Sequence, residues 1–380
     1  VVAFAMPPAV VAQAEQLAPF TGVPAKEGLE LEEQRIWDES VGFDRTLRRR
    51  GSLYGVAELD AYLQEVLDAL YPEFKGAIRV RTVNNPDLNA FALPNGSIYV
   101  HLGMLARLEN EAQLAAVLAH EGAHFAYRHG LQRIQSVKGG AAFALVVGMV
   151  GGVAGAPDVG SLLGQVALYS STYGFSREQE READRVGFER MVAVGYEPIQ
   201  GARVFELLRD EAALLEEMRP VMFSSHPKLE ERIASFRELS SNHPEAANLT
   251  RTDVERFLSA TALARADWLK QAFAFSRHKS IIHVLEQAGA AQRFPAHYPF
   301  YLAEAYRLRN GDGDAEKALL AYRLALERAP EFAPAYKSLG LVHMAAERKD
   351  EARAMFVQYL TLVPDADDAA FVTTYLQQLQ

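Results

Sequence analysis

The pattern of apolar and polar residues predicts a mainly helical chain that contains one small sheet. Residues 28–50 and 56–71 carry apolar side chains at helical spacing. Between residues 78 and 83 apolar and polar positions alternate instead, which predicts a strand. Two further apolar runs flank Pro94-Asn95-Gly96, and Asn-Gly between such runs is a strong hairpin signal. We therefore expect about three strands just before a helix over residues 110–129.

The chain after this helix is also helical in its hydrophobic pattern, with two interruptions. Helical patterns occupy residues 161–194, 199–219 and 229–239. Residues 139–157 carry no charge, and their length approaches that of a transmembrane span. Their glycines lower the helix propensity of the segment. We therefore expect it to be buried or to cover an active site, and membrane contact is the alternative. The polar break at residues 240–244 places a domain boundary after residue 242.

The C-terminal region repeats itself with a period of thirty-four residues. Its apolar and small residues fit the tetratricopeptide spacing at Tyr336, Leu339, Gly340, Ala352, Phe356 and Pro364. Thirty-four residues before the last three stand Ala318, Tyr322 and Pro330. Stacked repeats need neighbours to bury their faces, so residues 243–380 are expected to form a helical repeat domain.

Charge and composition exclude several classes of function. The formal net charge is −10, so we expect no nucleic-acid partner. The only basic run, Arg48-Arg49-Arg50, is interpreted as a solvated helix end. The chain has no cysteine, which excludes disulfides and thiol catalysis and restricts any zinc site to His and carboxylate ligands.

Residues 1–14 have the pattern of the end of a secretory signal peptide. They are apolar and uncharged, and Ala12-Gln13-Ala14 forms an A-x-A cleavage pattern before the acidic Glu15. The alternative is a loosely packed apolar segment. We expect a signal-peptide remnant and therefore an exported protein, with the next domain over residues 15–242.

The chemistry of the chain is concentrated at His120-Glu121-x-x-His124 inside the helix expected for residues 110–129. Positions four apart share one helix face, so His120 and His124 can both face one metal ion. Glu121 follows the first ligand and can act as general base on a water molecule. A chance match on an ordinary helix is the alternative, so the motif needs a third ligand.

Carboxylates of the segment from Ser176 to Asp184 offer that ligand. Glu180 and Asp184 are four residues apart, so one can bind a metal while the other hydrogen-bonds the free nitrogen of a ligand histidine. Glu178 and Glu182 lie in the same segment. An acidic, solvated helix face is the alternative interpretation of this segment.

Four stretches in this order, NAFALPNGSIYV, VLAHEGAH, FSREQEREADRVG and SSHPKLEERI, resemble one family. It is the family of zinc metallopeptidases that includes the HtpX-like, Oma-type and CaaX prenyl endopeptidases. With the C-terminal repeats, the chain is most similar to the periplasmic BepA-like members. The resemblance covers residues 75–240 strongly, whereas Gly122 stands where family members usually have a bulkier residue.

The resemblance implies a role for each site residue. His120, His124 and Glu180 would bind one zinc ion per chain, Glu121 would be the general base, and Asp184 would support a ligand. His226 would be a fourth, inhibitory ligand that keeps the enzyme latent, or else it would line the cleft. We expect an extended substrate to lie along the edge of the small sheet, with main-chain hydrogen bonds near Asn89 to Leu93. Tyr173, His226 and Arg232 are the candidates for contacting the oxyanion.

The implied architecture is a mainly α fold. It combines a zincin-type α+β protease domain, containing a small β-sheet, with an α-solenoid of tetratricopeptide repeats. The implied function is endopeptidase cleavage of unfolded or misassembled envelope proteins in the periplasm. The repeats would bind a client or an assembly machine of the outer membrane. Contact of the protein with the membrane is possible but is not predicted. The alternative is a chaperone-like or scaffold protein whose proteolytic activity is minor or repressed.

Overall fold

The computed structural model describes residues 17–136, 175–214 and 229–379. The predictions made for residues 1–14 and 139–157, and those for Tyr173 and His226, lie outside the described residues. The described chain is mainly helical with one three-stranded sheet, which confirms the predicted fold class. It divides into two compact units after Ala260.

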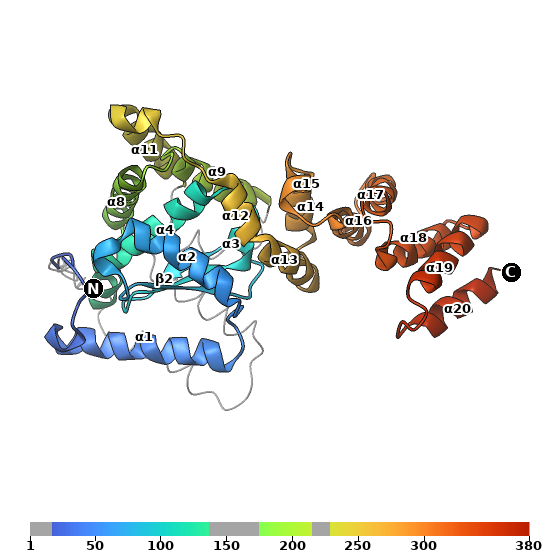
Figure 1. Ribbon diagram of the computed structural model, residues 1–380, viewed down its shortest axis with the longest axis horizontal. Helices are drawn as coiled ribbons and strands as arrows, with labels where there is room; N and C mark the ends of the chain where they lie inside the picture. The colour runs from blue at the N-terminus through green and yellow to red at the C-terminus, as the bar shows by residue number, and fades with distance from the viewer. Residues whose placement is uncertain (1–16, 137–174, 215–228, 380) are drawn as a thin grey trace, which may run out of the picture. The chain divides into compact units, whose positions relative to one another are not determined.

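The first unit holds the sheet and helix α4, Glu111–Ala126 (Figure 1), and this helix carries His120 and His124. Its helices and strands, in chain order, are η1 (Lys26–Gly28), α1 (Leu31–Arg49), α2 (Ala57–Leu70), η2 (Pro72–Phe74), β1 (Arg79–Val83), β2 (Ala90–Ala92), β3 (Ser97–His101), α3 (Leu102–Arg107), α4 (Glu111–Ala126), α5 (His129–Ser136), α8 (Arg177–Val194), α9 (Gln200–Leu214), α11 (Leu229–Asn242), η3 (Pro244–Asn248) and α12 (Val254–Ala260).

The sheet has the strand order β1-β3-β2. Strands β2 and β3 pair antiparallel around Asn95-Gly96, which confirms the predicted hairpin. Gly96 has φ 81°, and a Cβ there would lie 2.8 Å from the Ala77 carbonyl oxygen, so only glycine fits this turn. Strand β1 pairs with β3 in parallel, which leaves β2 at one edge of the sheet.

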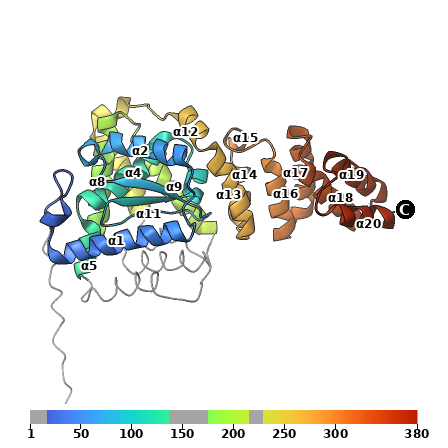
Figure 2. The same cartoon turned by 60° about the horizontal axis from the view of Figure 1, so that its bottom comes forward.

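Helices cover both faces of the sheet, with α1 on one side and α2 and α4 on the other (Figures 1 and 2). On the α1 side, the ring of Phe43 lies edge-on to Phe91 and Tyr99. On the other side, the hydroxyl of Thr82 donates to Asp60 of α2. These layers bury the apolar positions whose alternation predicted the strands.

Helix α4 is buried along its whole length. It begins at the cap residue Asn110, whose side chain accepts a hydrogen bond from the Gln113 amide. It ends at Ala126, because Arg128 has a left-handed backbone with φ 58°, and α5 starts at His129. The prediction of one helix over 110–129 is therefore wrong at its C-terminal end, since α4 ends at Ala126 and residue 129 already belongs to α5.

The segment after α11 packs against the start of α4. Glu111 is fully buried and receives hydrogen bonds from the Tyr62 and Tyr196 hydroxyls at 2.8 and 2.6 Å. The guanidinium of Arg256 lies 3.0 Å and that of Arg251 3.4 Å from the same carboxylate. Residues 244–260 thus belong to the first unit, whereas the sequence placed a boundary after residue 242.

The second unit, from Thr261 onward, is helical throughout its described residues. It comprises α13 (Ala262–Ala274), α14 (His278–Glu286), α15 (Ala290–Arg293), α16 (Tyr298–Arg309), α17 (Asp314–Arg328), α18 (Ala333–Ala345), α19 (Lys349–Leu362) and α20 (Ala369–Gln378). Helix α16 packs on α17 and α18 on α19. A Cβ on Gly340 of α18 would lie 2.6 Å from the Phe356 ring of α19, which explains the small residue at this position of the pattern. That these pairs are tetratricopeptide repeats stays a prediction.

Among the described residues, no helix combines the length and apolar character that a membrane crossing requires.

Candidate metal centre

Helices α4 and α8 bring together three side chains that can ligate one metal ion. Their possible ligand atoms, on His120, His124 and Glu180, all lie within 4.8 Å of one another. The two Nε2 atoms are 3.0 Å apart, and the Glu180 oxygens lie 3.6 Å from His120 Nε2 and 3.7 Å from His124 Nε2. All three residues are buried, with exposed fractions of 4, 2 and 3%. Two imidazole nitrogens and a carboxylate oxygen form a donor set that fits Zn²⁺.

Two local features of α8 bring Glu180 close to the two histidines of α4. Helix α8 starts with a capping box in which Ser176 and Gln179 bond each other's backbone amides. This start places Glu180 and Asp184 on the face turned toward α4. At the contact stands Gly187, where a Cβ would lie 3.4 Å from the His120 amide nitrogen, so a small residue lets the two helices approach closely.

The Asp184 carboxylate lies within hydrogen-bond distance of Nδ1 of His120, the ring nitrogen that is not expected to bind metal. Its Oδ1 lies 3.0 Å from His120 Nδ1, so a ring that binds metal through Nε2 can donate its Nδ1 hydrogen to this carboxylate. Burial raises the pKa of Asp184, but the charge of Arg232 and hydrogen bonds from His120 and Arg232 outweigh it and hold the pKa at about 2. Asp184 is therefore charged at neutral pH, which is the form that accepts the hydrogen bond.

Arg232 links the two carboxylates of α8. Its Nε and Nη2 donate to Asp184 at 2.9 and 2.6 Å, and its Nη1 lies 3.0 Å from Glu180 Oε2. Its Nη2 is also 3.0 Å from His120 Nδ1, but a protonated Nδ1 can donate only to the carboxylate. The guanidinium stacks over Phe205 at 4.0 Å. Burial lowers the pKa of Arg232, and the charges of Asp184 and Glu180 more than offset this and raise it.

The glycine that departs from the family pattern has a structural reason. A Cβ on Gly122 would lie 2.3 Å from Cε2 of the Tyr71 ring. The Tyr71 hydroxyl donates to the Ala119 carbonyl oxygen at 2.5 Å, one turn before Gly122. Tyr71 thus packs directly on the metal-binding turn of α4, beside the buried Glu121. Gly122 is thus the residue that makes room for the Tyr71 ring. Its presence does not alter His120, Glu121 or His124, the residues proposed to bind metal or act as base.

His129 is a site residue that the sequence interpretation missed. Its Nδ1 lies 2.9 Å from His124 Nδ1, and its Nε2 lies 3.2 Å from Glu182 Oε2. If His124 binds metal through Nε2, its Nδ1 donates to His129, whose own Nε2–H then points at Glu182. Burial lowers the pKa of His129, which favours the neutral ring that this chain of hydrogen bonds needs. The sequence offered two signals for this chain of hydrogen bonds: His129 stands five residues after His124, and Glu182 stands between Glu180 and Asp184.

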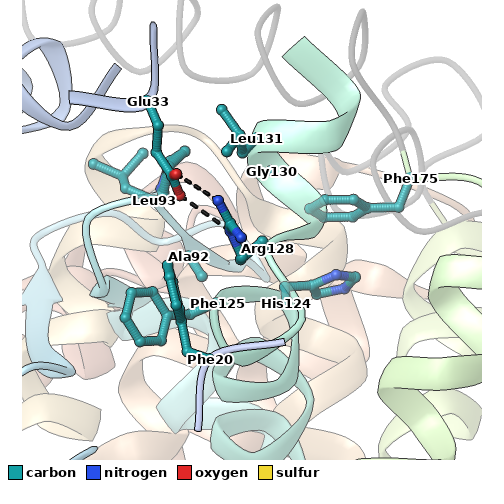
Figure 3. A pocket seen from close by; sticks show the side chains of 11 residues that line it. Phe20, Glu33, Ala92, Leu93, His124, Phe125, Arg128, Gly130, Leu131 and Phe175 are labelled. Atoms are coloured by element: carbon teal, nitrogen blue, oxygen red, sulfur yellow. Dashed lines mark hydrogen bonds and ion pairs between the residues drawn. The ribbon is translucent and has the colours of Figure 1, made fainter. Parts of the chain in front are cut away.

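A cavity adjoins His124 at the edge of the sheet (Figure 3). The Phe175 ring stacks on His124 at 3.7 Å on one side, and Ala92 and Leu93 line the cavity from β2 and the residue after it. Glu33 of α1 forms an ion pair with Arg128 at its rim. The cavity therefore joins the metal-binding helix to the edge strand.

Asn89 lies at the start of β2 and is buried. Its carbonyl oxygen accepts the His101 amide, and the Leu93 amide donates to the Ser97 carbonyl, so both residues use these main-chain groups toward β3. By the alternation of an antiparallel pair, Ala90 and Ala92 turn their main-chain groups away from β3. Among residues 89–93, for which substrate contact is predicted, these two alanines are the ones whose main-chain groups point away from β3.

Comparison with known proteins agrees with this geometry. Residues 56–240 match peptidase family M48. This part of the chain is similar to that family, whose members are metal-dependent peptidases. The resemblance seen in the motifs is thereby confirmed.

Three relatives illustrate the range of the similarity. The beta-barrel assembly-enhancing protease of Escherichia coli (strain K12) is 32% identical over 161 residues, 41% of this chain and 33% of that relative. The mitochondrial metalloendopeptidase OMA1 of Schizosaccharomyces pombe is 33% identical over 164 residues, 42% of this chain and 45% of that relative. Metalloprotease LoiP of Escherichia coli (strain K12) is 34% identical over 158 residues, 41% of this chain and 60% of that relative. The chain thus spans between a third and three fifths of the length of these relatives.

Proposed function

We propose that the chain is a zinc-dependent endopeptidase that cleaves unfolded or misassembled polypeptides. The observation that carries this proposal is the buried convergence of His120, His124 and Glu180 within 4.8 Å. A set of three protein ligands is typical of catalytic zinc sites, which keep a further position open. Glu121 follows a ligand on the same buried helix, where a general base is needed.

His120, His124 and Glu180 would hold one zinc ion per chain, and a bound zinc ion lowers the pKa of a water molecule and polarises the scissile carbonyl. Glu121 accepts the proton of the attacking water and delivers it to the leaving amine. Asp184 and His129 fix the rings of His120 and His124. Arg232 offsets the negative charge of Glu180 and Asp184, so two carboxylates can stay ionised in a buried site.

The substrate would lie extended along β2. Edge strands can accept a further strand through main-chain groups that point away from the sheet, and at β2 these belong to Ala90 and Ala92, which bond no other described residue through them. A chain that binds in this way must expose its own backbone over several residues. This requirement favours unfolded or misassembled proteins over native ones.

Two further roles rest on the family resemblance alone. His226 would act as a fourth, inhibitory metal ligand, and replacing it with Ala should then raise basal activity. A fall in activity would instead assign it to catalysis. Tyr173, His226 and Arg232 are the candidates for stabilising the oxyanion, and Arg232 is the one whose contacts the structure describes.

We further propose that the protein works in the periplasm, as a quality-control protease close to outer-membrane assembly. One relative is named for enhancing β-barrel assembly, and the helical second unit would supply the binding surface for a client or partner. A chaperone-like protein with minor proteolysis is the competing function, because the second unit is compact by itself.

Glu121→Gln separates these functions. The variant should keep its zinc and lose cleavage of an unfolded protein by at least about 100-fold, the typical contribution of a general base. Glu178→Gln is the matched control, because Glu178 is exposed in the first turn of α8 outside the donor group. Unchanged cleavage by Glu121→Gln would exclude Glu121 as the base, and absence of chelator-sensitive cleavage by the wild type would leave only the binding function.

A further inference from the structure

We propose that a second site, between α1 and the sheet, binds a phosphate group. A cavity of about 150 Å³ opens there, and three of its lining residues are arginines, Arg48, Arg79 and Arg81. It shares no lining residue with the cavities at His124 and Glu180. The site is therefore separate from the proposed peptidase centre.

The strand period brings two of these arginines to one face. Arg79 and Arg81 are two residues apart on β1, so both point to the same side of the sheet. In the parallel register they pair with Ser97 and Tyr99 of β3. The Tyr99 hydroxyl donates to Asp44 of α1 at 2.8 Å, which fixes this face against the helix that carries Arg48.

The positive charge in the cavity is only partly compensated. Arg48 Nε lies 2.9 Å from Asp44, whereas Arg81 Nε reaches Asp60 only at 4.0 Å. The Arg79 side chain takes part in no hydrogen bond or ion pair with any described residue, whereas its backbone amide donates to the Gly96 carbonyl. An excess of positive charge in one cavity is notable in a chain whose net charge is −10, and it attracts anions.

A buried amide supplies an independent indication. Asn95 also lines the cavity and is 1% exposed. Its Oδ1 accepts the Ser97 amide at 3.1 Å, which fixes the orientation of the side chain. Its Nδ2 has no hydrogen-bond acceptor among the described residues. Buried donors are paired in almost all native proteins, and an anion oxygen in this cavity would pair this one.

The donor set favours phosphate over carboxylate. A phosphate monoester carries about −1.5 to −2 charges at pH 7 and several strong acceptor oxygens, which suits two or three guanidinium groups. The planar fork of arginine matches phosphate oxygens in pairs. Free phosphate and a phosphate monoester both offer this chemistry, and the phosphodiester headgroup of an anionic phospholipid offers a pair of acceptor oxygens with one negative charge.

The test uses the full chain and two probes. Inorganic phosphate is titrated by NMR or calorimetry, and vesicles of phosphatidylcholine with and without phosphatidylglycerol are used for co-sedimentation. The variants are Arg79→Gln and Asn95→Asp, and the matched control is Arg45→Gln, because Arg45 is exposed on α1 but does not line the cavity. Thermal melting checks that each variant is folded.

We expect Arg79→Gln to weaken binding by about tenfold, as the loss of one charge-assisted hydrogen bond would. Asn95→Asp should abolish binding, because it replaces the donor with a negative charge, and Arg45→Gln should change it by less than about twofold. Specific binding of phosphate identifies a soluble ligand, and binding of phosphatidylglycerol vesicles alone identifies a headgroup; either supports the proposal. Absence of binding to both probes, or a loss of binding in Arg45→Gln equal to that in Arg79→Gln, would overturn it.

Discussion

Tyr71 closes over Gly122, with its ring in the space that a Cβ would occupy and its hydroxyl on the Ala119 carbonyl. The contact joins the end of α2 to the metal-binding turn of α4. The packing of Tyr71 on α4 therefore requires a glycine at position 122, where the family usually has a bulkier residue.

Gly122→Ala should therefore destabilise the protein, although alanine is the better helix former by about 1 kcal/mol. Overpacking of a core by one methyl group costs about 1–3 kcal/mol, which would lower the melting temperature by several degrees. Gly42→Ala in α1 is the control, since no atom lies within 4 Å of its Cβ position and the helix should be unchanged or more stable. A Gly122→Ala protein that melts like the wild type would remove this account of the glycine.

His129→Gln should weaken zinc binding by about 10- to 100-fold, the usual effect of removing a group that orients a ligand. Glu182→Gln should act in the same direction with a smaller effect, because Glu182 is partly exposed and one step further from the ligand. The measurement is competition for zinc against a chromogenic chelator. His243→Gln serves as control, because His243 bonds the Leu239 carbonyl oxygen and is not part of the donor group. Equal zinc affinity in His129→Gln and wild type would show that His124 needs no such support.

Ala92→Pro tests the edge strand. The Ala92 amide turns away from β3 and bonds no acceptor among the described residues, so proline removes a donor that a substrate strand would use. We expect lower kcat/KM for an unfolded polypeptide with unchanged zinc content. Leu93→Pro is the contrasting variant, because it removes the Leu93 amide that donates to Ser97 and should destabilise the sheet itself. Normal cleavage by Ala92→Pro would place the substrate elsewhere.

His101 predicts a pH dependence of stability. Burial lowers the pKa of this histidine to about 4, from the ordinary value of 6.5 for a solvent-exposed imidazole. Between these values the unfolded chain binds the proton and the folded protein does not, so stability is complete above pH 6.5 and falls as the pH drops toward 4. The loss is on the order of 3 kcal/mol. Urea unfolding at pH 7 and pH 4.5 should show a clearly smaller difference for His101→Gln than for wild type, and equal differences would exclude His101 as the cause.

The sequence was sufficient for the parts of the site that depend on local spacing. His120 with His124, and Glu180 with Asp184, are pairs four residues apart, so a helix alone places each pair on one face. The hairpin at Asn95-Gly96 is equally local. These features lie where they were predicted.

The contacts that could not be predicted depend on tertiary packing. Tyr71 meets α4 from 48 residues away and Arg232 meets Asp184 from 48 residues away, and no spacing rule encodes either contact. His129 reaches His124 only because the backbone at Arg128 is left-handed and ends α4 there. The parallel pairing of β1 with β3 could not be predicted either, because local spacing does not show which strand of the β2–β3 hairpin lies next to β1.

The central claim is that His120, His124 and Glu180 hold a catalytic zinc ion with Glu121 as the base. The most direct test is titration of zinc into chelator-treated protein while cleavage of an unfolded polypeptide is followed, for wild type and Glu121→Gln. Wild-type activity should return in proportion to zinc and saturate at one ion per chain. Glu121→Gln should bind the same amount of zinc with almost no cleavage. Full cleavage by the chelator-treated wild type, or by zinc-loaded Glu121→Gln, would contradict the account.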